Sequence, residues 1–360
     1  MNNKANSLRR KEAYHHEFHS LQIAAIKRMT SQAVVLTIEI PESVKPLYSF
    51  LPGQYVTLEL VIDGTPVRRS YSICSAPHEG TLQVGVKEVP QGLFSTYINQ
   101  QIKVGDAIKV GLPEGRFTFE ERQDPIPIMA IAAGSGITPI MSILKTVLHG
   151  SSLNPFTLVY GNKTPEETLF YKELQDLEDK YPEQLKVHWV FSKSNEKDAH
   201  FGRIDTALLN YALNQNSEAP ERFYLCGPEA MIRSSEQLLA DKGVAKQHVL
   251  FELFTASSQA AKVTNAAAEG LLKITCDETV HTVKLIPNKT LLDIALQAKL
   301  DVPYSCQGGV CSSCIGKITE GKAEMQANQI LTNEEVEEGL VLTCQAIAQT
   351  ENISVDYDDV

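Results

Sequence analysis

Four cysteines near the C-terminus constrain this chain more than any other feature. Cys306, Cys311 and Cys314 share one loop with the spacing C-x4-C-x2-C, and Cys344 follows after 29 intervening residues. This spacing is typical of plant-type [2Fe–2S] clusters, in which three thiolates come from one loop and the fourth comes from elsewhere. The sequence therefore predicts a fold that returns a distant cysteine to a single loop.

The residues between the cysteines suit the same chemistry. Gly308 and Gly309 let the backbone approach the bridging sulfides closely, so that N–H groups can point at them. Hydroxyl donors to the sulfurs are available from Ser305, Ser312 and Ser313. A structural zinc site is the alternative, because four cysteines also suit tetrahedral zinc. Zinc sites usually pair two short cysteine knuckles, whereas here one cysteine stands alone, so the cluster is favoured.

Length and composition limit the remaining possibilities. A chain of 360 residues predicts two or three domains. The longest apolar runs, such as residues 126–133, are far shorter than the roughly 20 residues that a membrane span needs, and the N-terminus lacks the apolar core of a signal peptide. Seven cysteines, four of them assigned to a cluster, favour a reducing cytoplasm. The other three, Cys74, Cys226 and Cys276, are expected to be buried.

The charge of the chain is acidic and uneven. The net charge of −11 argues against a nucleic-acid partner. Residues 269–360 hold fifteen acidic and six basic side chains, which concentrates the negative charge around the predicted redox centre. Such a surface can dock a basic face of a partner protein, or it can simply keep the chain in solution. Both interpretations stay open.

The first part of the chain has a β pattern. Residues 1–17 are predicted to be a disordered tail, and residues 18–122 a small antiparallel β-barrel with many short strands. A turn signal, Asp63-Gly64, joins two of these strands as a hairpin. The expected strands are 21–28, 33–40, 55–62, 67–74, 81–87 and 107–111, with a short helix at 93–100.

The period then changes. Residues 123–255 alternate buried strands with helices, which predicts a doubly wound α/β domain around a parallel sheet. Its expected strands are 126–133, 156–160, 187–192, 223–226 and 249–254, and its expected helices are 140–148, 166–177 and 229–242. Residues 256–268 lack a periodic apolar face and are predicted to be a flexible linker. Residues 269–360 form the cluster domain, with strands at 271–275 and 281–285 and a helix at 290–298.

One short motif at the end of the barrel hairpin introduces a family resemblance. Arg69-Ser-Tyr71-Ser72 has the form R-x-Y-S and resembles the flavin motif of the ferredoxin–NADP reductase superfamily. The resemblance implies that Arg69 pairs with the FAD pyrophosphate, that Tyr71 stacks on the isoalloxazine and that Ser72 lies near flavin N5. The chemistry is suitable, because arginine presents a planar fork to phosphate and tyrosine offers a flat apolar face.

Further segments resemble the same superfamily. After Lys87, the segment from Gly92 to Thr96 is similar to its G-x-x-S segment, which implies that backbone and hydroxyl groups meet the pyrophosphate at a helix N-terminus. The resemblance implies that the loop Gly134-Ser-Gly136-Ile-Thr138-Pro139 takes the nicotinamide nucleotide, that Cys226-Gly227-Pro228 lies beside the nicotinamide, and that the Glu252 to Phe254 segment lies against the flavin. The flavin and nucleotide residues that these segments supply are Arg69, Tyr71, Ser72, Lys87, Gly92, Ser95, Thr96, Gly134, Gly136, Thr138, Pro139, Cys226, Gly227, Pro228, Glu252 and Phe254.

The choice between NADPH and NADH depends on charges near the ribose 2′ position. Two expected strand ends supply Asn162-Lys163 and Ser192-Lys193, and neither carries an acidic residue directly at its end. The pattern favours NADPH, with NADH possible.

The three modules, in this order, resemble the reductase components of bacterial oxygenases, and in particular the reductase subunits of ring-1,2-phenylacetyl-CoA epoxidases. The resemblance implies a β-grasp ferredoxin fold for the last domain. It also implies an oxidoreductase in which Tyr71, Ser72, Thr138, Cys226 and Glu252 surround the reacting groups. Electrons are expected to pass from NADPH through FAD and the cluster to a di-iron oxygenase partner. A reductase of another oxygenase or hydroxylase is the alternative; a non-enzymatic redox carrier or sensor is the third interpretation.

Overall fold

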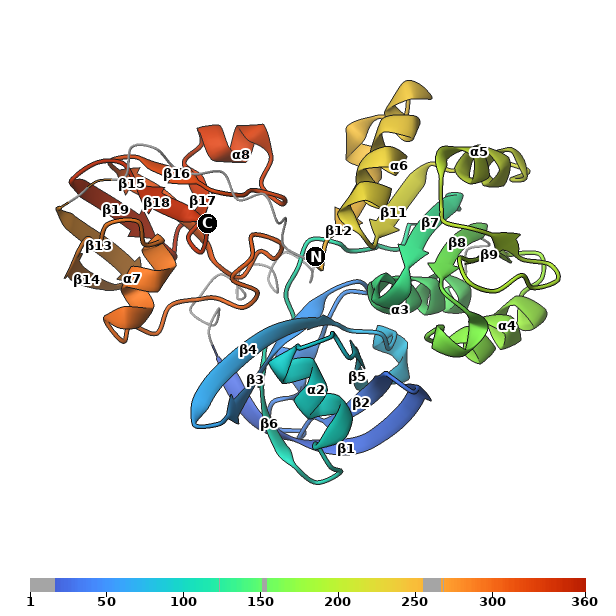
Figure 1. Cartoon of the computed structure of the whole chain (residues 1–360), viewed down its shortest axis with the longest axis horizontal. Coiled ribbons are helices and arrows are strands. Elements are labelled where there is room, and N and C mark those ends of the chain that lie inside the picture. Colours follow the sequence, from blue (N-terminus) through green and yellow to red (C-terminus); the bar gives the residue numbers. More distant parts are fainter. Residues whose placement is uncertain (1–16, 123, 151–153, 255–266, 268) are drawn as a thin grey trace. The chain divides into compact units, whose positions relative to one another are not determined.

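The computed structural model describes residues 17–360 apart from residues 123, 151–153, 255–266 and 268 (Figure 1). The predicted tail therefore lies outside the described residues except for its last position, and the predicted linker lies outside them except for Ala267. The chain forms two compact units. The larger contains residues 20–67 and 71–254, and the smaller contains mainly the residues from 267 to the C-terminus.

The first half of the larger unit is the expected antiparallel barrel. Its six strands are hydrogen-bonded in the order β4-β3-β6-β1-β2-β5, and a bridge between Ile73 and Val84 joins the end of β4 to β5. Helix α2 packs on β5 and buries Phe94 and Ile98 in the barrel core. The elements are β1 (Phe18–Thr30), β2 (Ala33–Glu39), η1 (Lys45–Tyr48), β3 (Tyr55–Ile62), β4 (Thr65–Ser72), η2 (Pro77–Glu79), β5 (Leu82–Lys87), α2 (Leu93–Gln100) and β6 (Ala107–Gly111).

The second half is the expected parallel sheet, drawn in green and gold in Figure 1. Its strand order is β10-β9-β8-β7-β11-β12, so the chain moves outward from β7 in one direction and then returns to place β11 on the other side. The strands are β7 (Ile128–Ala133), β8 (Phe156–Asn162), β9 (Leu185–Phe191), β10 (His200–Phe201), β11 (Arg222–Cys226) and β12 (Val249–Glu252). The α-helices are α3 (Ile137–His149), α4 (Tyr171–Lys180), α5 (Thr206–Asn214) and α6 (Glu229–Asp241), with 3-10 turns η3 (Gly134–Gly136), η4 (Pro165–Glu167) and η5 (Lys246–His248).

Barrel and parallel sheet share one hydrophobic core. Val35 and Cys74 of the barrel are buried in the same cluster as Ile137, Ile140 and Phe156 of the α/β part. Such close packing makes these two parts one compact unit, and it places α3 between them, in contact with β7, β8, β11 and the barrel turn η2.

Several expected boundaries in this part are wrong. The helix expected at 166–177 begins only at Tyr171, because Phe170 adopts a left-handed backbone with φ +59°, which cannot continue a right-handed helix. The helix expected from residue 140 begins at Ile137, since proline is tolerated in a first turn. The last strand ends at Glu252 rather than at residue 254. The sequence pattern did not reveal β10 or α5.

The smaller unit has a mixed sheet. Five strands are ordered β14-β13-β19-β15-β17, β13 runs parallel to β19 and antiparallel to β14, and β16 pairs with β18. Thr290 and Thr332 cap the two helices through capping boxes. The elements are β13 (Leu271–Cys276), β14 (Thr279–Lys284), α7 (Leu291–Gln297), β15 (Ile315–Glu320), β16 (Ala323–Met325), α8 (Asn333–Glu337), β17 (Leu340–Leu342), β18 (Ala346–Ala348) and β19 (Asn352–Asp356).

The start of this unit includes one residue of the predicted linker. Ala267 donates its N–H to the carbonyl of Ala348 at 2.9 Å and packs against the core of the sheet. Across the described residues of both units, no helix is long and apolar enough to cross a membrane.

Candidate cofactor sites

The four predicted cluster ligands converge at one end of the smaller unit. Cys311, Cys314 and Cys344 are buried, and Cys306 is half-buried. The sulfurs of Cys306 and Cys311 lie 3.0 Å apart. Two donors point at ligand sulfurs: the N–H of Gly308 lies 3.4 Å from Cys306 Sγ, and the amide Nε2 of Gln345 lies 3.5 Å from Cys344 Sγ. These are the groups that a negatively charged cluster requires.

Local backbone geometry explains why this loop can surround a cluster. Gln307 and Gly309 have positive φ values of 52° and 73°, which turns the chain sharply between the first two cysteines. A Cβ on Gly309 would lie only 3.0 Å from Cγ of Gln345, so glycine also permits the loop to contact the Cys344 segment. The loop and the distant ligand are therefore built to fit each other.

The fourth ligand is anchored by its neighbour. Both the N–H and the hydroxyl of Thr343 donate to the carbonyl of Cys314, at 3.0 and 2.9 Å. The hydroxyl of Tyr357 in turn donates to Thr343 Oγ1 at 3.0 Å. These buried bonds hold Cys344, just after β17, beside the loop that carries the other three cysteines.

Sulfur spacing separates the two metal interpretations. One zinc ion would draw all four thiolates to within about 3.8 Å of one another, given a Zn–S bond of ~2.3 Å and tetrahedral geometry. In the described part of the chain, the group that brings three ligating atoms within 4.8 Å of one another is Cys276, Asp277 and Asp358, and the three loop cysteines with Cys344 do not form such a group. The arrangement fits a two-iron cluster better than a single zinc.

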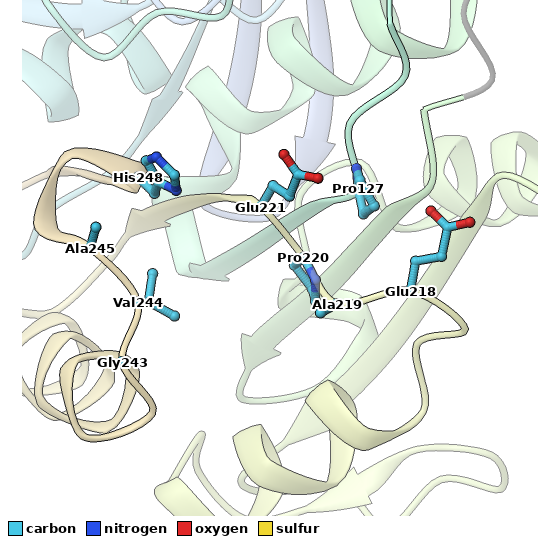
Figure 2. A pocket seen from close by; sticks show the side chains of 9 residues that line it. All are labelled: Pro127, Glu218, Ala219, Pro220, Glu221, Gly243, Val244, Ala245 and His248. Carbon is cyan, nitrogen blue, oxygen red and sulfur yellow. The ribbon is translucent and has the colours of Figure 1, made fainter.

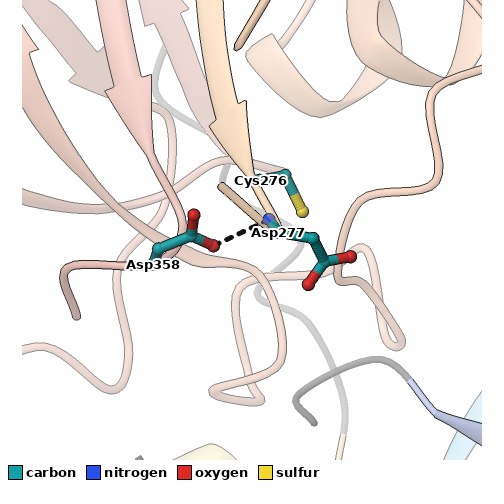
Figure 3. Close-up of side chains that lie close together, drawn as sticks. All are labelled: Cys276, Asp277 and Asp358. Atoms are coloured by element: carbon teal, nitrogen blue, oxygen red, sulfur yellow. Dashed lines mark hydrogen bonds between the residues drawn. The ribbon is translucent and has the colours of Figure 1, made fainter. Parts of the chain in front are cut away.

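The Cys276, Asp277 and Asp358 group has a structural explanation (Figure 3). Asp277 and Glu278 both have left-handed backbones, with φ values of 50° and 59°, in the turn between β13 and β14. The two carboxylate oxygens of Asp358 accept the N–H groups of Asp277 and Glu278 at 2.9 and 2.8 Å. Asp358 therefore fastens the C-terminal segment to this hairpin turn.

The predicted flavin residues lie on the barrel. Tyr71 is half-buried near the end of β4, and its ring is tilted against Phe94 at a centroid distance of 5.8 Å. No side chain caps the N-terminus of α2 at Gly92. The Ser95 hydroxyl accepts the N–H of Val89 at 3.0 Å, which shapes the preceding loop. An uncapped helix start can receive a phosphate group, so this part of the barrel fits a dinucleotide such as FAD.

Two further predicted flavin residues, Arg69 and Thr96, donate hydrogen bonds to nearby backbone carbonyls. Arg69 is exposed, and its guanidinium donates to the carbonyl of Arg68 at 2.7 Å. The N–H of Thr96 donates to the carbonyl of Gly92 at 2.9 Å, within the first turn of α2.

Three of the predicted catalytic residues, Ser72, Cys226 and Glu252, meet at the carboxyl ends of β11 and β12, beside the point between β7 and β11 where the direction of strand order reverses. This is the position at which open parallel sheets bind ligands. The hydroxyl of Ser72, from the barrel, donates to Glu252 Oε2 at 3.2 Å. Cys226 is the register partner of Glu252 on the neighbouring strand. Ser72 and Glu252, which are 180 positions apart in sequence, are thus in direct contact.

Glycines allow the loops around Cys226 and Thr138 to come into close contact. A Cβ on Gly136 would lie 2.1 Å from the carbonyl oxygen of Cys226, and one on Gly227 would lie 3.2 Å from Cβ of Ala133. A Cβ on Gly85 of the barrel would lie 2.6 Å from Cγ2 of Thr138. Because ordinary carbon contacts begin near 3.5 Å, no larger residue fits at these positions without movement.

The nucleotide loop itself is held by α3 and its surroundings. Gly134 has a positive φ of 56°, and its carbonyl accepts the hydroxyl of Tyr160 at 3.0 Å. Thr138 and Pro139 are buried in the first turn of α3, where the Thr138 hydroxyl donates to the carbonyl of Ser135 at 3.0 Å. Pro228 immediately precedes α6.

Burial determines the protonation of Glu252 and Cys226, which lie where the barrel meets the parallel sheet. We call this place the junction. Desolvation raises the pKa of Glu252 to about 8, although the hydrogen bond from Ser72 lowers it. Desolvation likewise raises the pKa of the Cys226 thiol well above its usual range, with a further rise from the carboxylate of Glu252. Both groups are therefore mainly protonated at neutral pH, and Glu252 can exchange a proton in the physiological range.

The predicted ribose-side residues lie together at the ends of β8 and β9. The N–H of Ser192 donates to the carbonyl of Asn162 at 3.0 Å, and that of Lys193 to the carbonyl of Lys163 at 2.9 Å. Both lysines are exposed, and Lys163 Nζ lies 3.2 Å from Glu167 Oε2. An acidic neighbour that the sequence interpretation did not weigh therefore shares this site.

Two outer positions complete the predicted set. Lys87 is half-buried at the end of β5; burial lowers its pKa, while the charge of Glu167 raises it and that of Lys163 lowers it. Phe254 is 41% exposed just beyond β12.

A hollow of about 600 Å³ lies at the amino-terminal ends of β7, β11 and β12, at the other end of these strands from the nucleotide loop (Figure 2). Its wall includes Pro127, Glu221 and His248, which immediately precede β7, β11 and β12. Nucleotides bind outside the carboxyl ends of such strands, so this hollow is separate from the nucleotide loop.

Sequence reasoning missed Gln345, Gly85 and Ser142. Gln345 was detectable in principle, since a side-chain amide next to a cluster cysteine is a ready donor to sulfur. Ser142 lies one turn after Thr138 in an otherwise mainly apolar helix, which marks it as a position with a polar partner. Nothing local distinguishes Gly85, because its requirement arises from contact with a distant loop.

Comparison with known proteins agrees with this architecture. Residues 20–119 match an oxidoreductase FAD-binding domain, residues 130–237 an oxidoreductase NAD-binding domain, and residues 274–349 a 2Fe-2S iron-sulfur cluster binding domain. These matches confirm the predicted FAD, nicotinamide nucleotide and [2Fe–2S] modules.

Relatives match almost end to end. The chain is 36% identical to one of the subunits of the 1,2-phenylacetyl-CoA epoxidase of Escherichia coli, over 95% of this chain and 98% of that protein. It is 31% identical to the ferredoxin reductase component of the 3-ketosteroid-9-alpha-monooxygenase of Rhodococcus rhodochrous, over 94% of this chain and 96% of that protein. Among solved structures, phthalate dioxygenase reductase shares the fold, with a TM-score of 0.62 and 24% identity over 96% of this chain and all of that one. The chain belongs to the family of FAD-, NAD- and [2Fe–2S]-binding reductases that supply electrons to multicomponent oxygenases.

Proposed function

We propose that this reductase takes electrons from NADPH and delivers them to a di-iron oxygenase component that epoxidises the ring of phenylacetyl-CoA. The observation that carries the proposal is the 36% identity, across all three modules, to the matching subunit of the Escherichia coli epoxidase. The 3-ketosteroid monooxygenase reductase component is 31% identical, so a ring-hydroxylating partner is the competing possibility.

The chain's own residues would bind and align the cofactors. When bound, FAD accepts a hydride from the nucleotide and releases single electrons, which the cluster carries onward. Tyr71 would offer an apolar face to the flavin, and the N-terminus of α2 with Ser95 would bind its phosphates. Gly134, Gly136 and Thr138 would let the nucleotide approach closely, and Cys226 would exclude water beside it.

Glu252 and Ser72 would manage a proton in the same place. With a pKa of about 8, the Glu252 carboxyl holds a proton at neutral pH, and its hydrogen bond with Ser72 links it to the flavin motif of the barrel. Removing the carboxyl would therefore change the pH dependence of flavin reduction rather than abolish binding.

Nucleotide choice would depend on Lys163 and Lys193, assisted by Asn162 and Ser192. The Glu167 carboxylate beside Lys163 offsets part of its charge, so we expect a moderate rather than an absolute preference for NADPH. Lys193→Ala should raise the KM for NADPH by about tenfold and leave that for NADH nearly unchanged, while Glu167→Gln should lower the KM for NADPH.

The domain limits follow from which segment binds which cofactor. We propose an FAD-binding domain at 18–122, a nucleotide-binding domain at 123–255 and a ferredoxin-type domain at 269–360, with a tail at 1–17 and a linker at 256–268. Limited proteolysis of the full chain should cut first within 256–268 and release a fragment that retains the cluster.

The test begins with the visible spectrum of anaerobically purified protein. Flavin and [2Fe–2S] bands that bleach on titration with NADPH, and more weakly with NADH, are expected. The reduced protein is then mixed with a phenylacetyl-CoA epoxidase oxygenase component, or with a 3-ketosteroid oxygenase component, and product is measured. Product with the first alone supports the proposal; product with the second alone transfers the assignment to ring hydroxylation. Absence of the cluster bands would overturn the electron route.

A further inference from the structure

One face of α3 carries a line of side chains directed at the barrel. Thr138, Ser142, Lys145 and His149 follow one another at intervals of four, three and four residues, so they share a single face of the helix. The first belongs to the nucleotide loop already described. The other three make contacts that the proposed electron route does not explain, and together they form what we call the α3 seam.

Ser142 makes the most buried contact of the α3 seam. Its side chain is fully buried, and its hydroxyl donates to the carbonyl of Ser75 at 2.7 Å. Ser75 is three residues after Ser72, in the segment that closes the barrel. A buried hydroxyl without a partner costs free energy, so this bond fixes the position of α3 relative to the flavin motif.

Lys145 connects three elements. Its Nζ lies 2.7 Å from Glu173 Oε1 on α4 and 3.5 Å from Glu79 Oε1 on the barrel turn η2, and its side chain is only 12% exposed. Burial opposes its charge, but the two carboxylates outweigh that effect and raise its pKa. The second oxygen of Glu79 accepts the N–H of Ala76 at 2.7 Å, which ties the ion pair to the backbone beside Ser75.

His149 closes the line at the end of α3. Its ring stacks on that of His78 in η2, with centroids 3.7 Å apart and planes 12° from parallel. Successive turns of the helix therefore contact the barrel through a polar or ring group, from the nucleotide loop to the last residue.

We propose that Ser142, Lys145 and His149 are positioning residues that set the distance between nicotinamide and flavin. The inference rests on the proposed hydride transfer from nucleotide to FAD. Because α3 carries Thr138 at its start and is fixed at Ser142 to the segment that follows Ser72, a shift along the α3 seam moves the two reacting faces apart. Displacement of about 1 Å can lower the rate of an aligned reaction by about 100-fold.

The experiment compares Lys145→Met with a matched control in the full-length holoprotein. Lys172→Met removes the same charge from the outer surface of α4, where Lys172 pairs with Asp176 at 2.7 Å and is 78% exposed. Stopped-flow measurement of flavin bleaching by NADPH should slow by about 10- to 100-fold in Lys145→Met and by less than about twofold in the control. The dissociation constant of NADP⁺ should change by less than about threefold, and Lys145→Arg should restore most of the rate.

A second readout does not depend on turnover. Hydrogen exchange of the backbone in residues 74–81 should accelerate in Lys145→Met and in Ser142→Ala, but not in Lys172→Met. Unchanged exchange and an unchanged bleaching rate in both seam variants would overturn the proposal. If wild-type protein is not reduced by NADPH or NADH, the proposed function fails instead. Faster exchange without any effect on the rate of reduction would also overturn the proposal, because the α3 seam would then only support the structure. Should Lys145→Met fail to fold, Ser142→Ala serves as the deciding variant.

Discussion

The cluster loop and the flavin–nucleotide junction achieve their function in opposite ways. Three of the four cluster ligands lie within nine consecutive residues, and the fourth is held by Thr343 and Tyr357, which directly follow strands of the same small unit. The junction instead takes Ser72 from the barrel, Thr138 from α3, and Cys226 and Glu252 from neighbouring strands of the parallel sheet. One site depends on local spacing, whereas the other depends on the packing of two domains.

This difference predicts how each site should fail. A loop that supplies its own ligands should lose its cofactor when one ligand is removed and leave the rest of the chain intact. A junction made by close backbone contact should keep its cofactors and lose alignment when a contact is enlarged. Variants of the two sites therefore test the comparison directly.

The largest expected effect follows removal of the distant ligand. Cys344→Ser should abolish the [2Fe–2S] cluster, because a serine hydroxyl is a poor substitute for a thiolate, and cluster-dependent electron transfer should fall by at least ~100-fold. Iron and acid-labile sulfide content measure the first effect, and cytochrome c reduction with NADPH measures the second. Flavin bleaching by NADPH should survive. Cys276→Ser, outside the proposed ligand set, is the control, and loss of bound FAD in Cys344→Ser would contradict the independence of the two sites.

A smaller but more specific effect is expected at the junction. Gly85→Ala places a methyl group 2.6 Å from Cγ2 of Thr138, and such overpacking typically costs about 1–3 kcal/mol. We expect NADPH to bleach the flavin about tenfold more slowly. Adding Thr138→Ser removes Cγ2 and retains the hydroxyl, so the double variant should recover at least half of the lost rate. If Gly85→Ala alone has no effect, contact between barrel and nucleotide loop does not control alignment.

The same contrast explains what sequence could and could not predict. The cysteine spacing, the R-x-Y-S segment and the glycine loop are short patterns whose chemistry is visible without a fold. Gly85 and Ser142 have no such pattern, because their roles arise only when α3 lies against the barrel. Phe170 illustrates a local limit: its left-handed backbone moved the start of α4, and the apolar periodicity of the segment gave no sign of it.

A third prediction concerns protons at the junction. In flavin-free protein, Glu252 has a pKa of about 8 when folded, against 4.5 for an ordinary glutamate. The folded chain therefore binds more protons between these values, and the stability due to this carboxyl is full below pH 4.5 and lost as the pH rises through 8. Glu252→Gln should flatten this loss, on the order of 4 kcal/mol between pH 5 and 9, in urea unfolding measured at about pH 5, 7 and 9. Equal pH dependence in both proteins would show that Glu252 is ionised at neutral pH.

The smallest expected effect returns to the local side of the comparison. Asp358→Ala removes both acceptors of the Asp277 and Glu278 N–H groups, which should cost about 1 kcal/mol because exposed hydrogen bonds contribute little. Hydrogen exchange of the peptide that contains the β13–β14 turn should accelerate, with iron content unchanged. Asp359→Ala, which breaks an exposed ion pair with Lys317, should leave that peptide unaffected. Glu278→Gly should partly compensate, since glycine adopts the left-handed backbone freely; if it does not, the carboxylate rather than the turn conformation limits the hairpin. Either outcome concerns only the few residues around one turn, whereas a single methyl group at Gly85 is expected to change the contact between the barrel and the nucleotide loop.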